Sequence, residues 1–111
     1  MGQNFNIVFE RDKNRCVYCG KDLLSDFESF MSAEEDHLIP KSKGGSDLPS
    51  NIVTSCNVCN RLKHNFVAEG FENMDISQII DSARTHIMKK RAEKLKDFMS
   101  WTIYDQKQYF T

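Results

Sequence analysis

The chain has 111 residues, of which 40% are apolar, and its net charge is −1. This length suits a single domain, residues 1–111, and a domain so small gains folding free energy from a bound metal ion. The net charge argues neither for nor against a nucleic-acid partner, because partners contact local charged patches. No run of about 18 apolar residues occurs, so we expect no transmembrane helix and no membrane partner.

The N-terminus lacks the basic and apolar regions of a secretory signal peptide. We therefore expect a cytoplasmic location, where thiols are kept reduced and stable disulfides are rare. The four cysteines then need an explanation other than disulfide pairing.

The predicted elements in the first part of the chain are short. Residues 5–9 are apolar and form either a strand or one buried helical turn. Residues 21–31 carry apolar side chains that line a helical face or pack a loop. Residues 36–40 predict a short strand that ends at a proline.

The middle of the chain continues with a loop, a strand and a helix. Residues 41–50 are rich in Gly, Ser, Lys, Asp and Pro and predict an exposed loop. Residues 51–54 predict a second strand, and residues 60–67, after the second cysteine pair, predict a helix.

A long amphipathic helix is predicted near the C-terminus. Asp75 or Ser77 is a suitable N-cap, and apolar residues recur at steps of three or four from Ile76 to about Met99. Residues 101–110 are aromatic and apolar, and we expect them to cover the core or to form a dimer contact.

The four cysteines form two Cys-x-x-Cys pairs, Cys16 with Cys19 and Cys56 with Cys59. Each pair places two thiolates where both reach one ion, and two pairs complete the tetrahedral set that zinc prefers. A closed set of four thiolates leaves no open coordination position. The sequence therefore predicts a structural Zn²⁺ and places the chemistry elsewhere.

Hard ligands and imidazoles gather around the predicted strands and helix. Asp36 and His37 lie on the first strand, and Asn51 opens the second. Asn60 and His64 are four residues apart, so they share one face of a helix. Oxygen ligands suit Mg²⁺ or Mn²⁺, and a neutral imidazole beside such an ion can accept a proton from water.

One physical objection applies to this arrangement. Successive residues of a regular strand point to opposite faces, so Asp36 and His37 cannot both face one ion unless the strand ends or bulges there. Pro40 favours an early strand end.

The ordered motifs between Arg11 and Asn65 resemble the zinc-containing HNH endonucleases, in the H-N-N variant. The segments that carry the resemblance are Cys16–Gly20, Asp36–Ser46, Leu48–Val53 and Cys56–Lys63. The resemblance implies an α+β fold with a ββα-metal core over about residues 11–65, held by the four-cysteine zinc site. The amphipathic helix and tail, about 75–111, follow this core.

The resemblance also implies roles for individual residues. His37 matches the general base, Asp36 the metal-binding acid before it, and Asn51 the amide that braces the loop and holds the base. Asn60 stands at the third signature position, where many members carry His and others carry Asn as a metal ligand. His64 matches a second helix histidine that contacts the metal or the scissile phosphate, although a solvated helix residue is an equally good interpretation.

Cations near the motif are candidates for phosphate contact. Lys41 and Lys43 flank the Gly-rich loop, and Arg61 and Lys63 lie on the predicted site helix. The basic stretch from Arg84 to Lys96 is a second candidate, with a solvated surface as the equal alternative.

The sequence therefore predicts an endonuclease that hydrolyses DNA, expected to be double-stranded, in the cytoplasm of a bacterial or phage-infected cell. Its cofactors are a structural Zn²⁺ and a catalytic Mg²⁺ or Mn²⁺, and a homodimer or a larger nuclease complex is expected. Two alternatives remain: a zinc-stapled nucleic-acid-binding module without catalysis, and a nuclease subunit that is active only with a targeting partner.

Overall fold

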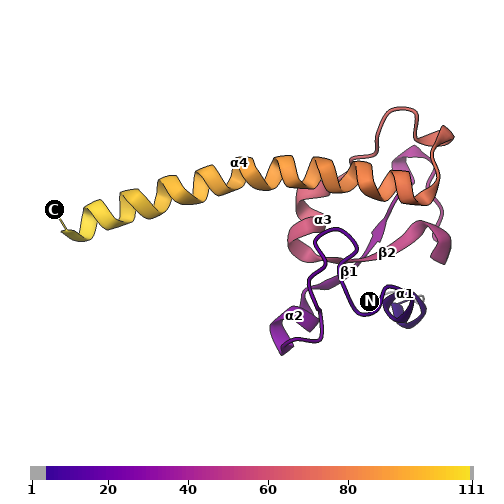
Figure 1. The fold of residues 1–111 in the computed structure, drawn as a ribbon, viewed down its shortest axis with the longest axis horizontal. Coiled ribbons are helices and arrows are strands. Elements are labelled where there is room, and N and C mark those ends of the chain that lie inside the picture. The colour runs from indigo at the N-terminus through magenta and orange to yellow at the C-terminus, as the bar shows by residue number, and fades with distance from the viewer. Residues whose placement is uncertain (1–4, 111) are drawn as a thin grey trace.

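The computed structural model describes residues 5–110, with side chains through residue 103. A two-stranded antiparallel sheet lies at the centre, and helices surround it (Figure 1). The helices and strands are α1 (Phe5–Arg11), α2 (Phe27–Met31), β1 (Ala33–His37), β2 (Ile52–Cys56), α3 (Asn57–Lys63) and α4 (Ile76–Phe110). Three short 3₁₀ turns, η1 (Lys41–Lys43), η2 (Pro49–Asn51) and η3 (Phe71–Asn73), connect them. The predicted α+β class and the strand–strand–helix order are confirmed.

The first strand lies earlier in the chain than the sequence predicted. β1 begins at Ala33 and ends at His37, so it includes the charged pair Glu34 and Glu35, which carries no apolar signal. Pairing with β2 fixes this position, because Ala33 lies opposite Cys56 and His37 lies opposite Ile52. β2 is buried along its whole length, and such a strand holds its partner in register.

α3 follows β2 without a linker. Cys56 ends the strand and caps the helix, and its sulfur accepts a hydrogen bond from the Cys59 amide. The helix ends at Lys63, because His64 adopts φ 53° and ψ −126°. The predicted helix 60–67 is therefore shifted, and His64 lies just beyond its C-terminus.

Residues 5–9, for which the sequence allowed a strand or a helical turn, lie in a helix, α1, which is anchored to β2. Arg11 donates hydrogen bonds to the carbonyls of Pro49 and Ile52, at 2.8 and 2.6 Å. The Asp12 carboxylate accepts from the Thr54 amide at 2.8 Å. The core behind these contacts joins α1, the two Cys-x-x-Cys pairs (the knuckles, Cys16–Cys19 and Cys56–Cys59), the sheet and the first half of α4.

α4 is longer than predicted and leaves the core halfway. Asp75 caps it as expected, because the Asp75 carboxylate accepts from the Gln78 amide and the Gln78 side chain accepts from the Asp75 amide. Ile79, Ala83 and Ile87 are buried. From residue 91 to 103 every described side chain is exposed, and the helix projects away from the rest of the fold (Figure 1).

The tail therefore does not cover the core in its described part. Trp101 and Ile103 remain exposed, while the side chains of Tyr104, Tyr109 and Phe110 lie outside the described part of the structure. No helix within the described residues is long and apolar enough to cross a membrane.

Candidate active site and metal centre

The four cysteine sulfurs converge at the junction of the first knuckle, β2 and α3. All four Sγ atoms lie within 4.8 Å of one another, and those of Cys19 and Cys56 are 3.9 Å apart. A tetrahedral ion with Zn–S bonds of about 2.3 Å separates its ligands by roughly 3.8 Å. The sulfurs are therefore placed to hold a metal ion such as zinc.

Ionisation of the Cys16 thiol disfavours ionisation of Cys56 and Cys59, as the directions of their pKa shifts show. Hydrogen bonds from Cys56 and Cys59 lower the pKa of Cys16, so its thiolate forms first. The hydrogen bond to that thiolate raises the pKa of Cys59, and the same contact with Cys16 raises the pKa of Cys56. A divalent ion removes this conflict, because a metal deprotonates its thiol ligands.

The candidate catalytic residues line one pocket of about 330 Å³ beside the end of β1. Asp36, His37, Asn60 and His64 all contribute to its wall. The two signature residues from β1 and the two from the end of α3 therefore meet, although they are distant in the sequence.

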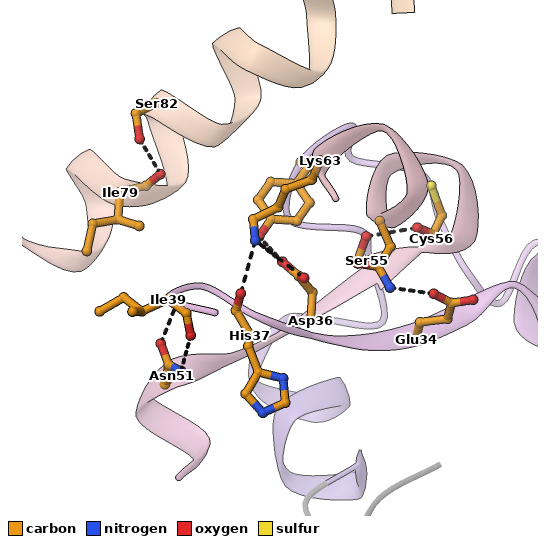
Figure 2. Close-up of polar contacts among 12 residues, drawn as sticks. Glu34, Asp36, His37, Ile39, Asn51, Ser55, Cys56, Lys63, Ile79 and Ser82 are labelled. Atoms are coloured by element: carbon orange, nitrogen blue, oxygen red, sulfur yellow. Dashed lines mark hydrogen bonds and ion pairs between the residues drawn. The ribbon is translucent and has the colours of Figure 1, made fainter. Parts of the chain in front are cut away.

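Asp36 points toward α3, where it lies in a buried network (Figure 2). Its Oδ2 atom accepts a hydrogen bond from the Tyr18 hydroxyl and forms an ion pair with Lys63 Nζ at 3.1 Å, and its Oδ1 atom accepts a hydrogen bond from Lys63 Nζ at 3.4 Å. Lys63 Nζ also donates to the His37 carbonyl at 3.0 Å. Burial raises the pKa of Asp36, and Lys63 opposes that shift. Burial and the charge of Asp36 also raise the pKa of Tyr18.

His37 points to the other side of β1 from Asp36, as strand geometry requires (Figure 2). Its Nε2 lies 2.8 Å from Asp47 Oδ1, and Lys41 Nζ lies 2.9 Å from Asp47 Oδ2. Hydrogen bonds from His37 and Lys41 lower the pKa of Asp47, so this carboxylate is ionised and only accepts. Nε2 is then the protonated nitrogen, and Nδ1 is the nitrogen that can accept a proton.

Asn51 spans the loop between the strands. Its Oδ1 accepts from the Ile39 amide at 2.9 Å, and its Nδ2 donates to the carbonyls of Ile39 and Ser46 at 3.0 and 2.9 Å. Gly45 passes so close that an added Cβ would lie 1.7 Å from the Ile39 carbonyl oxygen. These contacts fix the loop that carries Asp47.

The amide of Asn60 is oriented by Glu34 of β1. Asn60 Nδ2 donates to Glu34 Oε2 at 2.5 Å, which turns Oδ1 away as the potential oxygen ligand. His64 lies outside the helix but still lines the same pocket as Asn60. The prediction that Asn60 and His64 share one face of a helix is therefore wrong, because His64 is not helical, although both residues line the same pocket.

Comparisons with known proteins agree with this arrangement. Residues 16–66 match the family model described as HNH endonuclease. Residues 16–66 are therefore similar to HNH endonucleases. No solved structure shows significant similarity to the chain.

The chain is similar to a curated relative over part of its length. Over 60 residues the chain is 35% identical to the type IV methyl-directed restriction enzyme EcoKMcrA of Escherichia coli (strain K12). The match covers 51% of this chain and 21% of that relative, so the chain spans about a fifth of the relative's length.

The cations of the HNH segment fall into two groups. Lys41, Lys43 and Arg61 are exposed; Lys41 lines the pocket of His37, and Arg61 lines the neighbouring pocket that shares Asn60 and His64 with it. Lys63 is 1% exposed and pairs with Asp36, so its expected place on a phosphate-binding surface is wrong. Arg84, from the second candidate stretch, donates a hydrogen bond to the Val17 carbonyl at 2.6 Å. This contact links α4 to the first Cys-x-x-Cys pair.

Sequence reasoning missed three residues that organise the HNH site. Tyr18 and Glu34 hold the side chains of Asp36 and Asn60, and Asp47 holds His37. A weak signal was present for Asp47, because it is an acid in a turn-rich loop between two signature positions.

Proposed function

We propose that the chain is a metal-dependent endonuclease that hydrolyses DNA phosphodiester bonds. The observation that carries the proposal is a pocket lined by Asp36, His37 and Asn60, with the Asp36 side chain on the α3 side of β1 and the His37 imidazole on the other side. The family match of residues 16–66 and the relative named as a restriction enzyme support a nuclease. A binding module without catalysis would not need an imidazole oriented by a carboxylate beside two oxygen ligands.

The residues of the pocket fit a divalent ion. Asp36 Oδ1 accepts a long hydrogen bond, 3.4 Å, from Lys63 Nζ, and Asn60 Oδ1 is turned away from Glu34. These two oxygens, with His64, would hold Mg²⁺ or Mn²⁺. The ion would supply charge stabilisation at the phosphate and at the leaving oxygen. The four cysteines would hold a structural Zn²⁺.

His37 acts as the general base. Asp47 holds Nε2–H, so Nδ1 takes a proton from the attacking water as its oxygen bonds to phosphorus. The P–O3′ bond breaks and the leaving O3′ takes a proton from solvent water, which gives a 5′-phosphate and a 3′-hydroxyl. Asn51 keeps the loop in place and acts through position. Lys41, Lys43 and Arg61 contact the phosphates on either side.

A nuclease unit within a larger system is the second candidate. The match covers 21% of the relative, so most of that relative has no counterpart in the matched segment. A targeting partner or further segment would then select the DNA, and cleavage of a free plasmid would be weak.

A plasmid assay tests the proposal. Purified protein with supercoiled DNA and Mg²⁺ or Mn²⁺ should give nicked product, and His37→Ala should not. Because His37 is on the surface side of β1, the variant should keep its melting temperature. Equal cleavage by both proteins would refute the catalytic role, and less than about one zinc per chain in the wild type would refute the four-cysteine site.

A further inference from the structure

A groove of about 590 Å³ runs between α3 and the part of α4 that leaves the core. Four cations line it together with an apolar floor. The cations are Arg61, Lys90, Arg91 and Lys94, and the apolar residues are Val58, Leu62, Leu95 and Phe98. Val58, Leu95 and Phe98 are about half exposed or more, at 49%, 56% and 60%.

This groove adjoins the site at Arg61 of α3. Arg61 lines both the groove and a second pocket, whose wall also includes Asn60 and His64. Asn60 and His64 in turn line the pocket of His37. A chain that crosses the catalytic pocket therefore reaches the groove along one face of α3.

The chemistry of the groove selects its occupant. Four cations in one groove favour the binding of a polyanion, because each can pair with a negative charge. The exposed Phe98 ring offers a face on which a base can stack. A regular duplex presents phosphates but keeps its bases stacked inside, so it would leave Phe98 and Leu95 unused. A second copy of the chain would bring like charges together.

We infer that the groove binds an unpaired nucleotide next to the cleaved phosphate, with the base on Phe98 and its phosphates on Arg61, Arg91 and Lys94. This inference rests on the proposed function and adds the substrate class, DNA with a single-stranded segment at the cleavage position. Lys90 contributes less, because its Nζ lies 3.5 Å from Glu93. Within the basic stretch from Arg84 to Lys96, the inference assigns DNA contact to the side that lines the groove.

A binding experiment tests the groove separately from catalysis. The His37→Ala protein, which leaves the DNA intact, is titrated against a blunt fluorescent duplex and the same duplex with a single-stranded overhang. Anisotropy should show tighter binding to the overhang. Phe98→Ala should weaken overhang binding about tenfold, the order expected for the loss of one stacked base, and should leave the blunt duplex unchanged.

Matched variants on the same helix control for general effects. Lys94→Glu should remove the overhang preference, whereas Lys96→Glu should keep it, because Lys96 lies outside the groove. Met99→Ala, also outside the groove, is the control for Phe98→Ala.

Three results would overturn the inference. These are an overhang preference that survives Phe98→Ala, equal losses with Lys94→Glu and Lys96→Glu, and binding of an acidic peptide but of no DNA. A protein that prefers the overhang but, with Mg²⁺ or Mn²⁺, cuts neither plasmid nor the overhang duplex would instead refute the nuclease activity and leave the groove assignment standing.

Discussion

Lys63 and Asp36 form a buried ion pair whose removal should destabilise the protein strongly. Lys63 is 1% exposed and Asp36 is 6% exposed, measured on their side chains. Lys63→Met keeps an unbranched side chain of similar length but removes the ammonium group. Asp36 then keeps the Tyr18 hydroxyl as a partner but loses its only cation within 4 Å among the described residues.

The cost should be about 3–5 kcal/mol at neutral pH, the range measured when one partner of a buried pair is removed. The loss should also depend on pH. Burial raises the pKa of Asp36 above its ordinary value of 3.8, and Lys63 limits the rise. Without Lys63 the folded-state pKa rises further. Since the folded state then binds its proton more tightly than the unfolded state, stability falls as pH increases from about 4 through the folded pKa.

Urea unfolding of the zinc-loaded protein, without Mg²⁺ or Mn²⁺, measures this effect at pH 5.5 and 7.5. Lys63→Met should lose more stability at pH 7.5 than at pH 5.5. Arg61→Met is the matched control on the exposed side of α3 and should change the free energy of unfolding by less than about 0.5 kcal/mol. The double variant Lys63→Met/Asp36→Asn should be more stable than Lys63→Met, because no unpaired charge is buried.

The reasoning fails if Lys63→Met costs no more than Arg61→Met at pH 7.5. It also fails if the loss is the same at both pH values, because the buried carboxylate would then not be its cause.

Three further substitutions probe the rest of the site. Cys56→Ser should lose the bound zinc and lower the melting temperature by more than about 10 °C, checked by metal analysis and calorimetry; retained zinc would contradict the four-cysteine site. Gly45→Ala forces its Cβ against the Ile39 carbonyl and shifts the loop, so nicking should fall at least about tenfold, and an unchanged rate would show that the loop position does not matter. Asp47→Asn should slow nicking about tenfold at a melting temperature within about 2 °C of wild type, because Asp47 is exposed; an unchanged rate would exclude it as the partner that holds His37.

The sequence alone determined the features that depend on local spacing. Two Cys-x-x-Cys pairs specify a four-thiol site because each knuckle fixes two ligands within four residues. The Asp36–His37 dipeptide, Asn51 and Asn60 occur in the order of the family motif, which predicted the α+β class and the ββα arrangement. The N-cap at Asp75 was also predictable from the sequence, because its partner Gln78 is only three residues away.

Burial and long-range pairing decided the rest. Lys63 looked like a surface cation, but the packing of α3 on β1 turns it toward Asp36, 27 residues earlier in the chain. Asp47 reaches His37 because the loop between β1 and β2 folds back, and no sequence motif indicates this contact. Glu34 was invisible as a strand residue because charged residues carry no apolar pattern, and only pairing with the buried β2 places it beside Asn60. The two Cys-x-x-Cys pairs can be found in the sequence, whereas the partners that orient the candidate catalytic residues come together only when the chain has folded.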